Sequence, residues 1–231
     1  MPTKNGASSA PLEYKIIYSK RKTIELRFDG ANLLLIKVPQ RTRKSAIEAI
    51  LHQKADWIER TRKRLAQRLP VPQMVQGEQI LLLGSWHSLN IRKVVTPDEI
   101  FNTPGVITLS QKLASQGAVG LIPLYRQVTR QWTEHYAQIY SEKHQLPYNG
   151  IRVSSAKTRW GSCGANNTLN FSWRLAMTPL LSIEYVVAHE LAHIKHRNHS
   201  KAFWGFVAQI MPNYEQGRAW LKQNGHALPV F

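Results

Sequence analysis

Cysteine, acidic residues and long apolar runs are all scarce in this sequence of 231 residues. The one cysteine, Cys163, excludes an internal disulfide framework and suits a reducing compartment. No apolar run approaches the length of a membrane-spanning helix, and residues 1–10 lack the apolar core of a secretory signal. We therefore expect a cytoplasmic protein with no part in a membrane.

Acidic residues number 14 against 31 lysines and arginines, which gives a formal net charge of +17. The excess is spread along the chain, because residues 1–118 hold 19 basic and 9 acidic side chains and residues 119–231 hold 12 and 5. A field of this sign attracts nucleic acid or acidic proteins, although ordinary solubilising charge explains it equally well. Nucleic acid is thus a candidate partner, and the oligomeric state stays open.

The first half of the chain has the pattern of short strands. Apolar, β-branched and aromatic residues predict strands over 14–18, 23–28 and 33–38, and residues 79–92 suggest a hairpin. Ser45 has the spacing of a helix cap and begins one helix that ends before Pro70. We predict a loose arm over 1–11 and a β-rich unit over 12–118 with this one basic helix. Its cations form either a solvated face or a phosphate-contacting stripe; they are Arg60, Arg62, Lys63, Arg64 and Arg68.

The second half combines helices with two short strands. A helical period runs over 121–144, and strand patterns follow at 151–155 and 168–173. Thr178 and Pro179 form a good helix start, and two more helices are expected after Ser200 and over 213–224. We predict a second domain over 119–231, joined to the first near residues 117–120, and an α+β fold for the chain.

The helix that starts at Thr178 carries the chemistry. His189 and His193 lie four residues apart, so a helix places both imidazoles on one face, where they can grip a metal ion. Glu190 lies beside them and can hold a water molecule at that metal. With 9 histidines in the chain, chance would produce this pattern about 0.02 times. The pattern predicts a zinc-dependent hydrolase, most plausibly a peptidase, with one zinc ion per chain.

A catalytic zinc needs a third protein ligand, and His196 and His199 compete for this place. His196 continues the same helical face, but seven residues of straight helix rise by about 10.5 Å. Nitrogens that share one zinc lie only about 3.4 Å apart. We therefore expect the helix to end near 195–197, so that the chain turns at Asn198 and brings His199 under the first two ligands. His196 then becomes a residue of the rim or of the outer shell.

Glu190 is the predicted general base, which takes a proton from water and passes it to the leaving amine. The sequence does not single out a residue that stabilises the oxyanion, since His196, Asn198 and Tyr185 are all candidates.

Several blocks of this sequence together resemble the bacterial YgjP-like metal-dependent hydrolases, which are related to the SprT-like and WLM-type zincin peptidases. The blocks are Arg159-Trp160-Gly161-Ser162-Cys163, the strand before Thr178-Pro179, His189-Glu190-Leu191-Ala192-His193, and Asn198-His199-Ser200 with Phe203-Trp204. The resemblance implies a zincin-like catalytic half, with a small sheet and an active-site helix, after a β-rich N-terminal part. It also implies zinc at His189, His193 and His199 with Glu190 as the base, and proteins bound to nucleic acid as a substrate class.

The same comparison with zincins places the strand before the active helix at the rim of the cleft, where an extended peptide could pair with it. The predicted substrate-binding residues are therefore Leu169, Asn170, Phe171, Ser172 and Trp173, with His196 beside them. The segment from Trp160 to Cys163 favours a packed turn that supports the site. Lys157 and Arg159 form a solvated edge or bind a substrate carboxylate or phosphate.

Two other function classes stay open at this point. A basic nucleic-acid-binding module with a structural zinc would leave Glu190 without a use and would fill the fourth metal position. A zinc amidase that does not act on peptides would use the same chemistry, so the motif does not exclude it.

Overall fold

The computed structural model of the protein describes residues 12–29, 32–96, 100 and 103–231. Contacts within the chain divide it into two compact units, Met1–Arg68 and Leu69–Phe231. The arm predicted over 1–11 lies outside the described residues. None of the helices in the described ranges is both long and apolar enough to cross a membrane.

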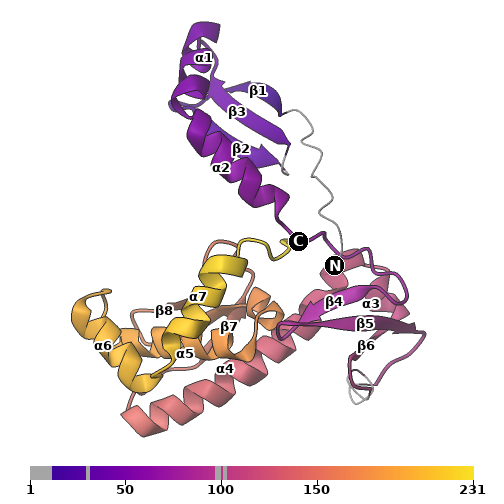
Figure 1. Ribbon diagram of the computed structural model, residues 1–231, viewed down its shortest axis with the longest axis vertical. Helices are drawn as coiled ribbons and strands as arrows, with labels where there is room; N and C mark the ends of the chain where they lie inside the picture. Colours follow the sequence, from indigo (N-terminus) through magenta and orange to yellow (C-terminus); the bar gives the residue numbers. More distant parts are fainter. Residues whose placement is uncertain (1–11, 30–31, 97–99, 101–102) are drawn as a thin grey trace, which may run out of the picture. The chain divides into compact units, whose positions relative to one another are not determined.

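The N-terminal unit is a three-stranded sheet with two helices (Figure 1). Its strands are β1 (Glu13–Ser19), β2 (Glu25–Asp29) and β3 (Leu33–Pro39), and the order in the sheet is β1-β3-β2. β1 runs parallel to β3 and β2 runs antiparallel to it. Successive side chains of β3 point to opposite faces of the sheet, so Leu34, Ile36 and Val38 all face the helices. There they pack with Ile47 and Ile58 in a small core.

The single helix predicted from Ser45 is wrong in detail, because the structure has two helices, α1 (Lys44–Gln53) and α2 (Ala55–Ala66). They meet at Lys54, whose φ of −100° and ψ of 8° lie outside the helical region. Ser45 does not cap α1 either, since Arg43 is the N-cap residue and its side chain accepts no cap hydrogen bond. No proline or glycine marks the break, and the apolar stripe continues through it with Ile47 and Ile58.

The C-terminal unit begins with a second three-stranded sheet. β4 (Gln79–Leu82) and β5 (Ser85–Arg92) form an antiparallel hairpin, and β6 (Val106–Ser110) pairs with β5 in parallel. The short helices α3 (Gln111–Ala114) and η2 (Gly117–Leu121) then lead into α4 (Ile122–His144). The first turns of α4 pack into one core with this sheet, and its later turns pack into a second core with the helix over Leu180–Lys195 (Figure 1).

This shared core explains why the units divide at Arg68 and not at the predicted joint near 117–120. Ile80, Leu89 and Ile107 of the second sheet lie in the same cluster as Leu124 and Tyr125 of α4. The residues at the predicted joint form η2, in which Ala118, Gly120 and Leu121 are buried. The glycines that suggested a linker are thus part of a packed turn.

The third sheet has the order β7-β9-β8, with β7 (Ile151–Ser154), β8 (Gly161–Cys163) and β9 (Leu169–Ser172). After it come η3 (Trp173–Met177) and the helices α5 (Leu180–Lys195), α6 (Lys201–Ile210) and α7 (Tyr214–Asn224). α5 packs its apolar side chains against this sheet and against α4. Ile183, Val187 and Leu191 are fully buried there. The α+β class predicted for the chain is confirmed at this level.

The sheet order corrects the predicted substrate-binding strand. β9 lies in the middle, where β7 pairs with one edge and β8 with the other, so its backbone groups are not free to bind a peptide. Most of the predicted side chains are buried as well, because Leu169, Phe171, Ser172 and the following Trp173 are at most 2% exposed; only Asn170 is half-buried. The strand that lies beside α5 at the edge of this sheet is β8.

Candidate metal centre

Helix α5 places two imidazoles one turn apart, and the turn after it places a third. The helix ends at Lys195, within the predicted range of 195–197. Ser200 then caps α6 by accepting a hydrogen bond from the Phe203 N–H, which fixes the turn that carries His199. As a result His189, His193 and His199 each offer one ligand atom, and these atoms all lie within 4.8 Å of one another.

The closest pair of nitrogens has the spacing of two ligands of one ion. His189 Nε2 and His199 Nε2 lie 3.0 Å apart. Two imidazole lone pairs at this distance repel each other unless a proton or a metal ion lies between them. Ligand nitrogens around a tetrahedral zinc are about 3.4 Å apart, so the pair fits such an ion with little adjustment. Three imidazoles are also a donor set that suits zinc.

His193 is oriented by the backbone of the following turn. Its Nδ1 lies 3.0 Å from the carbonyl oxygen of His196, so Nδ1–H donates to that oxygen and Nε2 keeps its lone pair for a metal. The ring of His196 packs edge-on against Phe206 and does not line the cleft. The prediction that the His196 side chain binds substrate therefore finds no support, and its backbone orients a candidate ligand instead.

Helix α6 supplies the floor of the centre. The fully buried ring of Phe203 lies 5.0 Å from that of His189, 4.6 Å from His193 and 4.8 Å from His199, measured between ring centroids. Trp204 stacks on the outer side of His199 at 5.8 Å. These contacts hold the three imidazoles in place before any ion binds, and they explain why an aromatic pair follows the histidine turn.

Glu190 is buried beside the imidazoles and is 5% exposed. Burial raises its pKa from 4.5 to about 8, although a hydrogen bond from the Cys163 backbone N–H and the charge of Arg159 act in the opposite direction. Strand β8 packs directly on the carboxylate: a Cβ atom added to Gly161 would lie 2.7 Å from Glu190 Oε1. β8 thus holds the carboxylate from one side, which gives the segment predicted to support the site its physical role.

Two adjoining cavities open along β8 and α5 and share Gly161, His189 and Glu190. One of about 270 Å³ lies over the three histidines, and one of about 180 Å³ lies toward Trp160 and Tyr185. Together they form a cleft with the candidate metal position near its middle and Glu190 on its wall.

The surroundings of the cleft are cationic. Three arginines are close enough to change the pKa values of the site residues. The charge of Arg159 lowers the pKa of Glu190. Arg197 and Arg218 lower the pKa values of His193 and His189, respectively. Burial is the largest cause of the shift at His189, where it lowers the pKa to about 3 and keeps the imidazole neutral. Arg197 is also structural, since it donates to the carbonyl oxygen of Gly164 at 3.0 Å and so ties the β8–β9 turn to the turn that carries His199.

A family model described as YgjP-like, metallopeptidase domain matches residues 22–224, which is most of the chain. The chain belongs to this family. It is accordingly a metal-dependent hydrolase, and the resemblance noted in the sequence is confirmed.

Two known proteins are similar to parts of this chain. A curated relative, the UTP pyrophosphatase of Escherichia coli (strain K12), is 28% identical over 78 residues, which cover 32% of this chain and 47% of that protein. The match thus spans about half the length of this relative. The crystal structure of the metallopeptidase zymogen of Pyrococcus abyssi abylysin aligns with 42% of this chain and 99% of that one, at 16% identity and a TM-score of 0.37.

Sequence reasoning missed two residues of this YgjP-like site. Gly161 looked like part of a turn, and only its distance to Glu190 shows why a side chain does not fit there. Arg218 lies on α7, over the ring of Trp204 at 4.2 Å, and no local pattern connects it with the histidines. Cys163 does not join the histidine cluster, and its sulfur lies 3.5 Å from the guanidinium of Arg197.

A methyl group at residue 161 is expected to displace the carboxylate of Glu190. The Gly161→Ala variant should lose about a hundredfold in turnover, the usual cost of moving a reacting group by about 1 Å, and should keep its metal. The measurement is the hydrolysis rate together with the metal content. Gly205→Ala is the matched control, because nothing lies within 4 Å of its added Cβ. Full activity of the Gly161→Ala variant would contradict this packing.

Metal-free protein should show the raised pKa of Glu190 in its stability. Between 4.5 and about 8 the folded state holds a proton that the unfolded chain has lost, so the free energy of unfolding falls as pH rises through this range. Glu190→Gln removes this loss, which is on the order of 5 kcal/mol. Calorimetric melts in chelator should therefore show a higher melting temperature for the variant at about pH 8.5 and a smaller difference at about pH 5. A difference that does not change with pH would contradict the prediction.

Proposed function

We propose that this YgjP-like protein is a zinc-dependent peptidase. In this proposal His189, His193 and His199 hold one zinc ion per chain and Glu190 is the general base. The observation that carries it is the convergence of three imidazoles beside one buried carboxylate in an open cleft. A purely structural metal site would have no use for that carboxylate, and its burial costs stability.

A zinc ion at the three imidazoles would lower the pKa of a water ligand to about 7 and polarise the carbonyl group of a substrate. Glu190 takes the proton of the attacking water at its carboxylate and passes it to the leaving nitrogen. The raised pKa of this carboxyl suits both steps, because a group that accepts and then donates a proton works best near the working pH. The Cys163 N–H and the close approach of Gly161 keep the carboxylate facing the cleft.

Strand β8 replaces β9 as the proposed binding edge for an extended peptide. In an antiparallel ladder, backbone groups point alternately toward the partner strand and away from it. The backbone N–H of Ser172 donates to the carbonyl oxygen of Trp160, and the backbone N–H of Gly164 donates to that of Thr168. The backbone groups of Trp160 and Gly164 therefore face β9. The backbone groups of Gly161 and the carbonyl oxygen of Cys163 then face the cleft, where a substrate strand can pair with them. The Cys163 N–H points the same way and is already bound to Glu190.

A second candidate substrate is the phosphoanhydride of a nucleoside triphosphate. Two observations favour it. The curated relative that this chain matches over about half of that protein's length is a UTP pyrophosphatase. The exposed Arg159 and Arg218 are close enough to influence the pKa values of Glu190 and His189, respectively. Guanidinium groups bind phosphate oxygens well, and no acidic residue besides Glu190 lines the two cavities. The same metal and the same base would then act on a phosphorus centre.

One experiment separates the two. Zinc-loaded protein is incubated with an unfolded protein substrate and, separately, with nucleoside triphosphates, and products are identified by mass spectrometry. New peptide termini that disappear with chelator and with Glu190→Gln support the peptidase. Release of pyrophosphate under the same controls supports the second candidate, and no product from either substrate would overturn both.

A further inference from the structure

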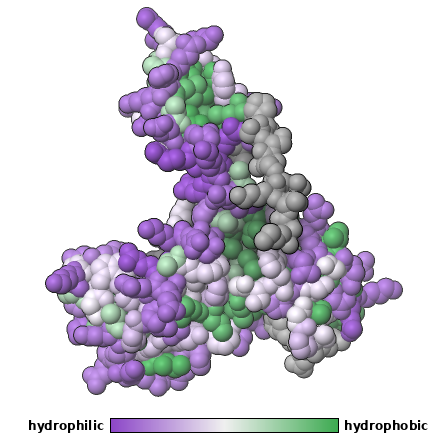
Figure 2. All heavy atoms as spheres, viewed as in Figure 1, coloured by the Kyte–Doolittle hydropathy of each residue, from purple (hydrophilic) through white to green (hydrophobic). Residues whose placement is uncertain are grey.

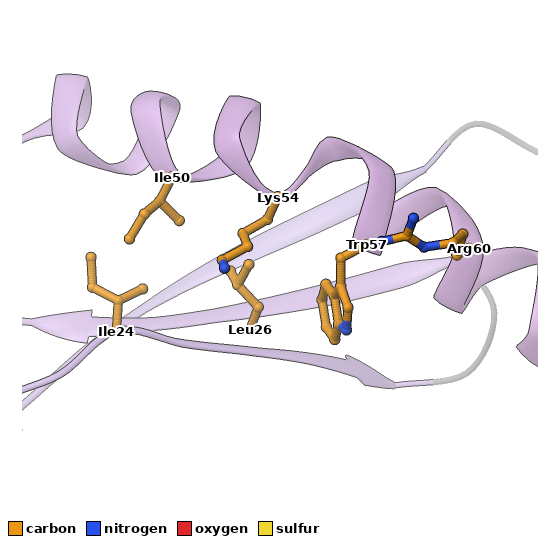
Figure 3. A pocket seen from close by; sticks show the side chains of 6 residues that line it. All are labelled: Ile24, Leu26, Ile50, Lys54, Trp57 and Arg60. Atoms are coloured by element: carbon orange, nitrogen blue, oxygen red, sulfur yellow. The ribbon is translucent and has the colours of Figure 1, made fainter.

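The N-terminal unit has a groove of its own, far from the histidines in sequence (Figure 3). It has a volume of about 440 Å³, within the range of about 300–1,000 Å³ in which proteins bind small ligands. Its apolar floor consists of Ile24 and Leu26 of the β2 region and Ile50 of α1. Figure 3 shows that the indole of Trp57 points from α2 into the groove. Lys54 and Arg60 complete the lining.

Trp57 offers an accessible aromatic surface here. Its side chain is 38% exposed, and its ring packs against Phe28 at a centroid distance of 6.2 Å. One side of the indole is thus fixed by the unit, and the rest stays open to a ligand. On the space-filling view this unit shows an apolar patch bordered by hydrophilic residues (Figure 2).

A line of cations continues from the groove along α2. Trp57, Arg60 and Arg64 follow at spacings of three and four residues, so they lie on one flank of the helix, and Arg68 follows four residues later. Arg64 is close enough to Arg68 to lower the pKa of its guanidinium, after the larger effect of desolvation. Lys54, Arg60 and Arg64 are exposed and form no ion pair within the described part of the unit.

The acidic residue of α2 that does form ion pairs lies on another side. Glu59 binds Lys63 at 3.6 Å and Arg62 at 4.0 Å, so those two cations are partly neutralised. The basic residues of the helix therefore divide into a paired group and an unpaired line beside Trp57. The unpaired cations are the ones available for the phosphate-contacting stripe that the sequence offered as one of two interpretations of this helix.

We propose that this groove binds single-stranded nucleic acid, with one base stacked on Trp57 and the phosphates beside it on Lys54, Arg60 and Arg64. Proteins that bind single strands combine an aromatic platform with a cationic track along the backbone, and both are present here. A duplex fits less well, because its bases are stacked and cannot enter a recessed pocket. An acidic peptide would fit the floor, but several unpaired cations that follow one another away from an aromatic ring match a polymer with a charge on every unit and a ring on every unit.

The test is fluorescence anisotropy with labelled single-stranded DNA and RNA of about 12 nucleotides, within the site sizes of about 4–16 known for such grooves. The full chain should bind, and Arg60→Gln with Arg64→Gln should weaken binding about tenfold or more. The salt dependence, log K against log salt, should become shallower by about 1.4, since each phosphate contact contributes about 0.7. Trp57→Ala should cost about tenfold and Trp57→Phe much less.

The matched control is Lys44→Gln with Lys63→Gln, which removes the same charge from residues paired with Glu48 and Glu59. The proposal is overturned if this control weakens binding as much as Arg60→Gln with Arg64→Gln does. It is also overturned if Trp57→Ala weakens binding of heparin, which has no bases, as much as binding of the single strands, or if only an acidic apolar peptide binds in the groove. Circular dichroism melts establish that each variant is folded. Because this binding measurement does not involve the metal centre, its result is independent of whether the proposed hydrolase activity is correct.

Discussion

Replacing Glu190 with glutamine is expected to reduce turnover by about 10²–10⁴-fold, the usual contribution of a general acid–base group, and to leave the metal bound. Glutamine has the size of glutamate and can still accept the hydrogen bond of the Cys163 N–H. It cannot take a proton from water at neutral pH. The three imidazoles are untouched, so zinc content measured by plasma mass spectrometry should equal that of the wild type.

The matched control for this change is Glu184→Gln on the same helix. Glu184 accepts a hydrogen bond from Tyr140, on the side of α5 that faces α4, and a glutamine oxygen can accept it as well. This variant should keep full activity. A Glu190→Gln enzyme that is active and fully loaded with metal would show that another group moves the proton.

The second large effect is expected at His199 and not at His196. His199→Ala removes one of the three converging nitrogens, and even loss of an outer-shell partner costs about 10–100-fold in metal affinity. We therefore expect His199→Ala to lose more than a hundredfold in zinc affinity, and all activity with it. Competition with a fluorescent zinc chelator measures the affinity directly.

His196→Ala should bind zinc nearly as the wild type does. Its backbone carbonyl, which orients His193, remains, and only the packing of its ring on Phe206 is lost. If His196→Ala lost the metal while His199→Ala retained it, the ligand set proposed here would be wrong. Thermal melts of both metal-free variants separate loss of a ligand from loss of folding.

The geometry of a single helix was enough to favour His199 over His196. Helix rise is a local property, and it excludes two ligands seven residues apart on a straight segment. The structure ends α5 at Lys195 and brings His199 Nε2 within 3.0 Å of His189 Nε2. The identity of the ligands themselves stays a prediction until a metal is measured.

The order of strands could not be predicted in the same way. Leu169 and Phe171 alternate as in a strand that faces a core, and a central strand and an edge strand can share this pattern. What decides is the pairing of β9 with β7 and with β8, which are separated from it by loops. The role of Gly161 could not be predicted for the same reason, because it depends on the carboxylate of Glu190, which lies 29 positions away in the sequence.

The boundary between the two units could not be predicted from the sequence either. Glycines at 117 and 120 suggested a joint, but Gly120 packs so closely that an added Cβ would lie 1.9 Å from the Leu113 carbonyl oxygen. The residues that do separate the units, near Arg68, precede Pro70 and Pro72 and looked like an ordinary helix end. Whether a glycine or a proline marks a linker depends on its packing partners, which are distant in sequence.

X-ray absorption at the zinc edge of purified, active protein identifies the ligands of the metal directly. We expect one zinc per chain with three imidazole nitrogens at about 2.0–2.1 Å and no sulfur ligand. A spectrum with a sulfur neighbour would bring Cys163 into the centre, and one with four imidazoles would fill the position that catalysis requires to be open. Either result would contradict a catalytic centre built from His189, His193 and His199 beside Glu190.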